Sequence, residues 1–570
     1  MAHFHIKTKK GRPYLYVREI ARVNGKPKVV SQVYLGSPEK VAQLAKGGDD
    51  GDRRLIVNKW GALWLADQID QDVDIAGIVD EVVPTSKRET GPSVGEYFRY
   101  AVLNRMVEAV SKNQLPQWYS RTAVQEIRPV DVGQLTSQHY WDKWHRVTEE
   151  QLGEIARRFF DRVWGAEKAE ADCLLFDTTN YFIFMASKTP SNLARRGKNK
   201  EGRDNLRQVG LGLLIGRGTR LPRHYVVYPG NLHDSRVFQG ILDQAKSFLR
   251  GTTEKERLTV VVDKGMNSAD NYAIIDATRD IRFVTTYSLH FAETLAAVPL
   301  EQYEPLTEAL SQKQRDDDDH LKVYRTQMDL WGKKRTVVMT FNPRTQRKQQ
   351  HEFERKLDTL REDLLAMRAK VRENAPQWRD AEAIRDRYVA RCEGLHLPTD
   401  LYELTFSTED GQMAMTFAKS AHRTQQRERM FGKNLIVTDN HDWTTTEIVS
   451  ASLDRFEIEQ CFRQTKDDDL VGVQPIRHWT DSKIQCHLFT CVAAMTYLRR
   501  LELRLRRTGI QRTAADVMAD MQHLHSILAI PAGARNPRRS LETPSKTQAE
   551  VLRAFNREID GSGVLRALGH

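Results

Sequence analysis

The sequence has no long apolar run and few cysteines. No stretch approaches the roughly 18 uninterrupted apolar residues that a transmembrane helix needs, and no apolar segment follows the basic residues of the N-terminus, as it would in a secretory signal. The five cysteines include no C-x-x-C pair, which argues against a structural zinc site or a disulfide framework. These absences predict a protein of the reducing cytoplasm that does not contact a membrane.

Basic residues outnumber acidic ones. The chain has 87 Lys and Arg against 76 Asp and Glu, a formal net charge of +11, which suits a polyanionic partner. The excess is concentrated in two regions: residues 1–40 carry nine basic and two acidic side chains, and residues 186–225 carry ten and two. Both regions are candidate phosphate-binding surfaces.

The 570 residues exceed the roughly 250–300 at which a single hydrophobic core stops growing, so we expect several domains. Periodicity and composition divide the chain into six regions. They are a basic N-terminal β segment of three antiparallel strands (1–45), a helical domain (53–165), the first part of an α/β core (166–295), an insertion with a helical hairpin and strands (296–440), the second part of the core (441–508) and a C-terminal region (509–570).

The α/β pattern begins at Cys173. Three strand-like runs, CLLFDTTNYFIF, VGLGLLIG and RHYVVYP, precede the helical SRVFQGILDQAKSFL. The run LTVVV is apolar on both faces, which is typical of a central parallel strand, and a helical NYAIIDAT and the strand-like RFVTTYSL follow it. This order of strand, strand, strand, helix, strand, helix, strand predicts a mixed α/β sheet.

The insertion has its own pattern. A heptad stripe of apolar residues in a charged segment predicts one arm of an antiparallel helical hairpin without chemistry. The stripe consists of Phe353, Leu357, Leu360, Leu364, Met367 and Val371. LYELTFSTEDGQMAMTF then predicts a β-hairpin about Asp410 and Gly411, and GKNLIVTD predicts one more strand.

Two aspartates follow apolar runs of predicted strands. Asp177 follows CLLF and Asp263 follows VVV, so we expect each carboxylate near the carboxyl end of a buried strand. In open α/β sheets that edge is where binding sites form. Aspartate also commonly ends a strand as a turn former, and this structural alternative stays open for each residue.

One predicted helix presents an acid flanked by two bases. Arg455, Glu459 and Lys466 follow one another at intervals of four and seven residues, which at ~100° per residue keeps them within roughly 60° of one face. A solvated ladder of ion pairs has the same spacing. The apolar neighbours favour a partly buried helix instead. They are Phe456, Ile458, Cys461 and Phe462.

In this arrangement the sequence resembles the DDE transposases of bacterial insertion sequences, in the group with the motif Y-x-x-R-x-x-x-E-x-x-x-x-x-x-K. Arg455, Glu459 and Lys466 match that motif, and Ser452 stands where its tyrosine would be. The resemblance covers most of the chain. It also rests on FDTTNYF, YPGNLHDSRVF, VVVDKGMNS and IRHWTDSKIQCHLF, which are weakly specific singly and specific together in this order.

The resemblance implies an RNase H-like mixed α/β catalytic core with a large insertion. It also implies two Mg²⁺ ions in the active site, replaceable by Mn²⁺, with Asp177 bridging both and Asp263 and Glu459 each completing one. Carboxylate oxygens are ligands that Mg²⁺ prefers, and a pair of such ions serves the attacking and leaving oxygens of a phosphodiester. Arg455 and Lys466 are expected to hold flanking phosphates.

The implied partners are transposon inverted-repeat ends and target DNA, held by a homodimer in a synaptic complex in the bacterial cytoplasm, near the nucleoid. Two basic segments are candidates for DNA binding, although a solvated loop explains the second equally well. The candidates are Lys7, Lys9, Lys10 and Arg12 of the N-terminal strands, and Arg195, Arg196 and Lys198 of the second basic region. A ribbon of strands or the helices of 53–165 can read bases in the major groove.

The predicted function is metal-dependent cleavage at transposon ends and strand transfer into target DNA. The alternatives are an RNase H-like nuclease without strand transfer and a catalytically inactive DNA-binding regulator derived from a transposase. Asn231 and Asp234 are interpreted as a turn and a helix cap, outside the catalytic set. The glycines of residues 210–216 are interpreted as a bulge or a site of close packing.

Overall fold

The computed structural model describes most of the chain. It describes residues 2–9, 12–23, 26–36, 54–84, 90–169, 172–197, 202–203, 205–249, 257–278, 280–306, 320–409, 412–467, 470–530 and 538–568. The chain divides into two compact units. Unit 1 consists of Met1–Trp64, Tyr119–Pro129 and Val517–His570, and unit 2 consists of Leu65–Trp118 and Val130–Asp516.

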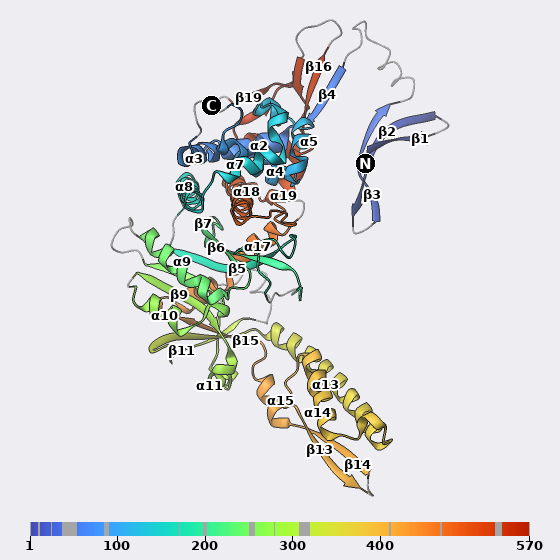
Figure 1. The fold of residues 1–570 in the computed structure, drawn as a ribbon, viewed down its shortest axis with the longest axis vertical. Coiled ribbons are helices and arrows are strands. Elements are labelled where there is room, and N and C mark those ends of the chain that lie inside the picture. Colours follow the sequence, from blue (N-terminus) through green and yellow to red (C-terminus); the bar gives the residue numbers. More distant parts are fainter. Residues whose placement is uncertain are drawn as a thin grey trace. The chain divides into compact units, whose positions relative to one another are not determined.

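Unit 2 is built on one mixed sheet, in which nine strands are described (Figure 1). Its strands are β5 (Cys173–Ile183), β6 (Arg207–Gly216), β7 (Pro222–Pro229), β8 (Leu258–Val262), β9 (Ile281–Tyr287), β10 (Glu304–Pro305), β11 (Lys322–Leu330), β12 (Lys333–Phe341) and β15 (Lys433–Thr438). Across the sheet the order is β10-β11-β12-β15-β9-β8-β5-β6-β7. β8 runs parallel to both of its neighbours, β5 and β9, and the other pairs are antiparallel.

The predicted order of elements in the first part of the core is confirmed. β5, β6 and β7 are followed by α9 (Asp234–Leu249), β8, α10 (Ala269–Asp276) and β9. All five residues of β8 are buried, as expected for a central strand with two apolar faces. The prediction of a mixed α/β sheet is therefore correct.

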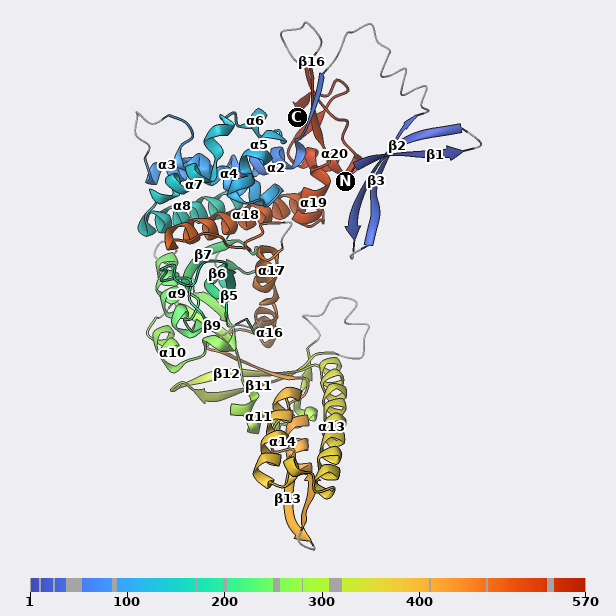
Figure 2. The same cartoon turned by 45° about the vertical axis from the view of Figure 1, so that its right-hand side comes forward.

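Helices cover both faces of this sheet (Figure 2). On one face α9 packs against α10, and on the other lie α16 (Thr445–Leu453), α17 (Phe456–Thr465) and α18 (Asp481–Arg507). The other helices are α2 (Gly61–Asp70), α3 (Ile75–Val82), α4 (Val94–Val107), α5 (Leu115–Ser120), α6 (Val124–Ile127), α7 (Ser137–His145), α8 (Glu149–Glu167), α11 (Glu293–Ala296), α13 (Pro343–Arg372), α14 (Ala381–Leu395), α15 (Ala421–Glu428), α19 (Ala514–Met521) and α20 (Lys546–Ala554). The helices expected for residues 53–165 are α2 to α8, and they begin after the strand β4 (Arg54–Lys59).

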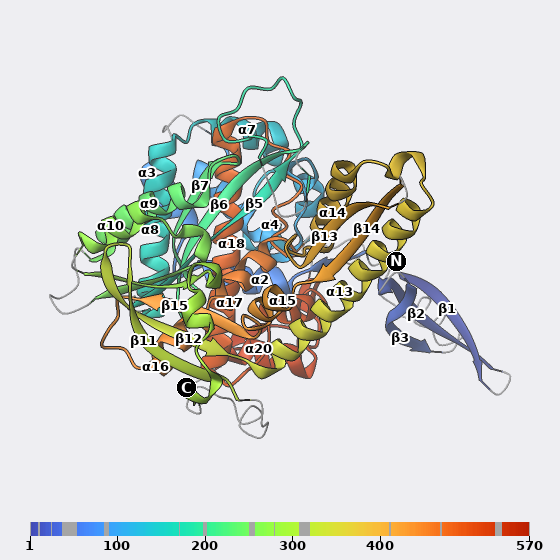
Figure 3. The same ribbon diagram turned by 90° about the horizontal axis from the view of Figure 1, so that it is seen from below.

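The sheet continues into residues that the sequence pattern assigned to the insertion. β11 and β12 form an antiparallel pair, and β12 pairs directly with β15. Between β12 and β15 lie α13, α14, the predicted hairpin of β13 (Tyr402–Glu409) and β14 (Gln412–Lys419), and α15 (Figure 3). The heptad stripe supplies their common core, in which Leu360 and Leu364 are fully buried. Asp410 and Gly411 lie outside the described residues.

Unit 1 contains three small antiparallel sheets among its described residues. The predicted N-terminal strands are β1 (Ala2–Lys9), β2 (Arg12–Val23) and β3 (Lys26–Gly36). The second sheet joins β4 (Arg54–Lys59), β16 (His525–Ile530) and β17 (Arg538–Leu541), and the third joins β18 (Arg557–Ile559) and β19 (Leu565–Ala567). The second sheet is unexpected, because its strands come from the two ends of the chain.

Candidate active site

Asp177 and Asp263 occupy matching positions on neighbouring parallel strands. Leu175 of β5 is paired with Val261 of β8, and each aspartate stands two residues further along its strand direction. An even offset keeps a side chain on the same face, and adjacent strands lie about 4.8 Å apart. Continuing this register places the two carboxylates near each other where β8 ends, beside the middle of β5, which extends to Ile183. Both residues are partly exposed.

Each carboxylate has a described contact that orients it. The Thr178 backbone N–H donates to Asp177 Oδ1 at 2.8 Å. Arg455 Nη1 lies 2.9 Å from Asp263 Oδ1, with the arginine side chain 17% and the aspartate side chain 34% exposed. The structure therefore brings together Asp263 and Arg455, which are far apart in the sequence.

Two contacts at opposite ends of α17 fix its direction along β5. Arg455, the residue that precedes the helix, holds Asp263, and Thr465 at its end hydrogen-bonds the hydroxyl of Tyr181. Tyr181 is four residues beyond Asp177 on β5. α17 thus runs in the same direction as β5, and Glu459, one turn after Arg455, lies at the level of the strand just past Asp177.

The two glutamates of the first turn of α17 have opposite environments. Glu457 is buried, accepts a hydrogen bond of 2.8 Å from the Gly218 backbone N–H, and lies 4.0 Å from Arg220. Burial raises the pKa of Glu457, and the Gly218 N–H opposes that rise. Glu459 is exposed. Of the two, only Glu459 is therefore available to a ligand in solution.

Lys466 ends α17 on the face that carries Arg455 and Glu459. Its Nζ lies 5.9 Å from the centre of the Tyr181 ring and the side chain is otherwise exposed. The predicted single helix is in fact two, since α16 stops at Leu453 and Asp454 binds Arg217 at 2.7 Å. Arg455, Glu459 and Lys466 nevertheless share one face of the helix, as their spacing predicts, because Arg455 and Lys466 both have helical backbone angles.

Tyr228 and Asp234 lie at the border of this site, and the sequence did not single out Tyr228. The Tyr228 hydroxyl donates to Asp234 Oδ1 at 3.0 Å. Burial raises the pKa of Tyr228, and the nearby charges of Asp234 and Asp177 raise it further. Its ring crosses Gly210, where a Cβ would come within 2.2 Å of it. Close packing thus explains this glycine.

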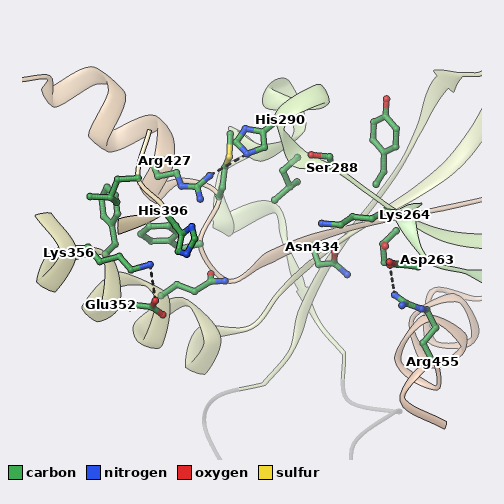
Figure 4. Close-up of a pocket in the computed structure, with 18 residues that line it drawn as sticks. Asp263, Lys264, Ser288, His290, Glu352, Lys356, His396, Arg427, Asn434 and Arg455 are labelled. Carbon is green, nitrogen blue, oxygen red and sulfur yellow. Dashed lines mark hydrogen bonds and ion pairs between the residues drawn. The ribbon is translucent and has the colours of Figure 1, made fainter. Parts of the chain in front are cut away.

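A cavity of about 630 Å³ opens beside Asp263 (Figure 4). It extends from the sheet edge to α13 and α15, and its charged lining is mostly basic. The charged and histidine side chains are Asp263, Lys264, His290, Glu352, Lys356, His396, Arg427 and Arg455. Within it Arg427 contacts His290 at 3.3 Å and Lys356 pairs with Glu352 at 3.0 Å. Sequence periodicity did not reveal that the insertion forms one wall of this cavity.

The predicted DNA-binding residues fall in both units. In unit 1, Lys7 is exposed on β1. The backbone positions of Lys9 and Arg12 are paired across the turn between β1 and β2. In unit 2, Arg195 and Arg196 are exposed, and the Arg195 backbone bridges to Gln208 of β6. Lys10 and Lys198 lie outside the described residues.

Among the described residues, no three acidic, histidine or cysteine side chains lie close enough together to form a metal-binding group. Asp177 and Asp263 are placed together by register, whereas Glu459 projects from the neighbouring helix without a described contact to either. Within the described part of the chain, no helix is long and apolar enough to span a membrane.

No family model matches the chain, and a search of curated proteins finds no match. Among solved structures the chain is similar to the piggyBac transposase in a cryo-EM structure of its synaptic complex with hairpin DNA. The identity is 8% and the TM-score 0.35, over 81% of this chain and 79% of that chain. A likeness this distant supports no assignment of fold or function.

Proposed function

We propose that the chain is a DNA transposase of the DDE type, which cleaves transposon ends and joins them to target DNA. The observation that carries the proposal is the edge formed by β5, β8 and α17. There Asp177 and Asp263 stand in register, and Arg455 binds Asp263 one helical turn from Glu459.

The sheet supports an RNase H-like core for the same protein. The β7-β6-β5-β8-β9 portion contains the five strands that the resemblance implies, connected in the implied order by α9 and α10. The third acid follows on a later helix, also as implied. The long connection between β9 and α17 contains the insertion, so the sequence distance between Asp263 and Glu459 is consistent with this core.

The donor set fits a hard divalent cation by its chemistry. Asp177, Asp263 and Glu459 offer only carboxylate oxygens, the ligands of Mg²⁺, with Mn²⁺ as a substitute. Mg²⁺ ions held by these residues would activate the attacking oxygen and stabilise the leaving oxygen of a phosphodiester. For all three acids to share such ions, Glu459 must turn toward the strand ends and Asp263 must exchange its contact with Arg455.

The remaining charged residues have roles that need no metal geometry. Once Asp263 is engaged elsewhere, the Arg455 guanidinium is available to a DNA phosphate, which it can hold through two N–H groups. Lys466 offers a second cation on the same face of α17. Together they position the phosphodiester over Asp177 and Asp263, where a water or a 3′-hydroxyl attacks the phosphorus and the bridging oxygen leaves.

A strand-transfer assay tests the proposal. Pre-nicked inverted-repeat ends, target DNA and Mg²⁺ are incubated with the chain, with Glu459→Gln and with Glu362→Gln, an exposed glutamate of α13, as the matched control. We expect joined product with the chain and the control, and a loss of about 10²–10³-fold with Glu459→Gln. Cleavage without joined product favours an RNase H-like nuclease, and DNA binding with neither reaction favours an inactive regulator.

A further inference from the structure

A second hollow of unit 2, of about 750 Å³, lies apart from the three acids. It is enclosed by the residues after α4, by α7, and by the segment that leads into α18. Its basic and histidine lining consists of Arg105, Lys112, Arg477, His478, Lys483 and His487. The described residues that line it include four aromatic side chains and no Asp or Glu. The hollow is therefore suited to an anion that carries an aromatic group.

Lys112 is a buried cation without a hydrogen-bond partner. The residue is only 8% exposed, and its Nζ makes no hydrogen bond in the described structure. Nζ lies 5.1 Å from the Trp144 ring centre and 5.5 Å from that of Tyr140. The hydroxyl of Tyr140 and the indole N–H of Trp144 are likewise buried and unbonded. Since buried polar groups are normally satisfied, these three donors point to a missing acceptor.

Two tryptophans supply stacking surface at the same place. Trp479 is 60% exposed, and Lys483 Nζ lies 4.6 Å from the centre of the Trp141 ring. Large aromatic side chains that stay exposed beside cations are the elements with which proteins bind unpaired nucleotides, the ring stacking on a base and the cation holding a phosphate.

The chain connects this hollow to the end of β5. After α17 the Val473 N–H donates to Thr465 O at 3.1 Å, and the Phe184 N–H, just past β5, donates to Ile476 O at 3.1 Å. Trp479 also lines a neighbouring hollow of about 510 Å³ together with Arg196 and Arg207, again without an acid in its described lining. The two hollows thus share Trp479, and both lie beyond the end of β5 with cations in their described lining.

We propose that this hollow binds one unpaired nucleotide of a DNA strand, with the phosphate held by Lys112 and Lys483 and the base stacked on Trp479. The proposal rests on the proposed function only in naming DNA as the source of the nucleotide. The hollow itself is independent of Asp177, Asp263 and Glu459.

Fluorescence anisotropy with a short labelled single-stranded oligonucleotide tests this proposal on the full chain. We expect Trp479→Ala and Lys112→Met each to weaken binding about tenfold, in line with a stacking contribution of ~1–3 kcal/mol per base. Phe291→Ala is the matched control, because that side chain is 73% exposed and lies outside the hollow. Trp479 is exposed, so its variant remains informative if Lys112→Met fails to fold.

Three further arms identify the ligand. An oligonucleotide with abasic sites should bind the chain and Trp479→Ala equally well, since only the base stacks on that ring. Competition by a free deoxynucleotide as strong as that by the oligonucleotide would show a mononucleotide site and overturn the DNA assignment. Wild-type affinity in both Trp479→Ala and Lys112→Met would overturn the site itself. The binding measurement needs neither cleavage nor joining of DNA, which separates its result from any failure of catalysis.

Discussion

At the residue scale, two glutamates that are one residue apart are expected to respond in opposite ways to the same change. Glu459→Gln should abolish strand transfer and leave stability unchanged, because its side chain is exposed. Glu457→Gln should retain folding and raise stability at neutral pH. The neutral amide keeps an acceptor for the Gly218 N–H and removes a buried charge.

The pH dependence of stability separates the two variants. The pKa of Glu457 is raised in the folded state, so its contribution to stability is present below the unfolded pKa and is lost as pH rises through the folded pKa. Thermal unfolding measured from pH 4 upward should therefore show the advantage of Glu457→Gln growing with pH. An advantage that is constant across this range would contradict the assignment of Glu457 as a buried acid with a raised pKa.

Lys112 predicts a second pH effect, on binding. Burial and, to a smaller extent, the neighbouring Arg105 lower its pKa to about 7, while Cys491 opposes this shift. The affinity for the labelled oligonucleotide should rise as pH falls through 7, because the protonated ammonium is the form that holds a phosphate, and Lys112→Met should lose that dependence. His478, His487 and Tyr140 do not compete: burial lowers the pKa of His478 to about 3 and that of His487 strongly, and raises that of Tyr140. Lys483, also nearby, has a lowered pKa.

At the scale of elements, the packing of β7 against β6 depends on a glycine of β6. Its Gly210 allows the Tyr228 ring to cross the strand, and an added Cβ would meet that ring at 2.2 Å. Gly210→Ala should lower the free energy of unfolding by roughly 1–3 kcal/mol, as overpacking does. Gly240→Ala in α9 is the control, since nothing lies within 4 Å of its Cβ, and it should stabilise by about 0.5–1 kcal/mol. Urea unfolding of both variants measures these two changes in the free energy of unfolding.

Local patterns were sufficient for the elements whose burial repeats within a few residues. β8 is apolar on both faces, and the stripe from Phe353 to Val371 has heptad spacing, so both were predicted correctly. β4, β16 and β17 were missed because each is short, and because the pairing of β4 with β16 joins residues from opposite ends of the chain. β11 alternates exposed and partly buried residues in a charged segment, and its place in the sheet depends on β12.

The candidate site, too, could be predicted from the sequence only in part. The alignment of Asp177 with Asp263 follows from two apolar runs that the sequence does show. The strand end expected at Asp177 was wrong, because β5 continues to Ile183 through its pairing with β6, whereas Asp263 does follow the end of β8. The contact between Arg455 and Asp263, the cavity wall from α13 and the hollow around Lys112 join residues far apart in the chain. Such contacts leave no periodic signal.

At the scale of the whole molecule, the net charge of +11 makes salt the most informative variable for binding. The logarithm of DNA affinity should fall linearly with the logarithm of salt concentration, by about 0.9 for each phosphate neutralised. Arg196→Ala and Lys7→Ala should each reduce that slope by about 0.9, if these exposed side chains of units 2 and 1 contact phosphates. Anisotropy titrations at several salt concentrations measure the slope, and an unchanged slope removes that residue from the interface.

The insertion predicts the outcome of a large deletion. Phe341 pairs with Lys433 across β12 and β15, and the Asn342 N–H donates to Gly432 O at 2.8 Å, so the two ends of the segment 343–431 are adjacent. Replacing that segment by an Asn-Gly turn should leave a simple hairpin and a cooperative unfolding transition. DNA binding should weaken, because one wall of the cavity beside Asp263 is lost. A multistate transition would show that the insertion supports the sheet.

The adjacency of Asn342 and Gly432 has a broader consequence. To the rest of the sheet, everything between those two residues is topologically one hairpin turn. A foreign domain whose own termini lie close together can therefore be exchanged at this position without altering the pairing of β12 and β15. The same sheet can thus carry different inserted domains between β12 and β15, each lying next to Asp263.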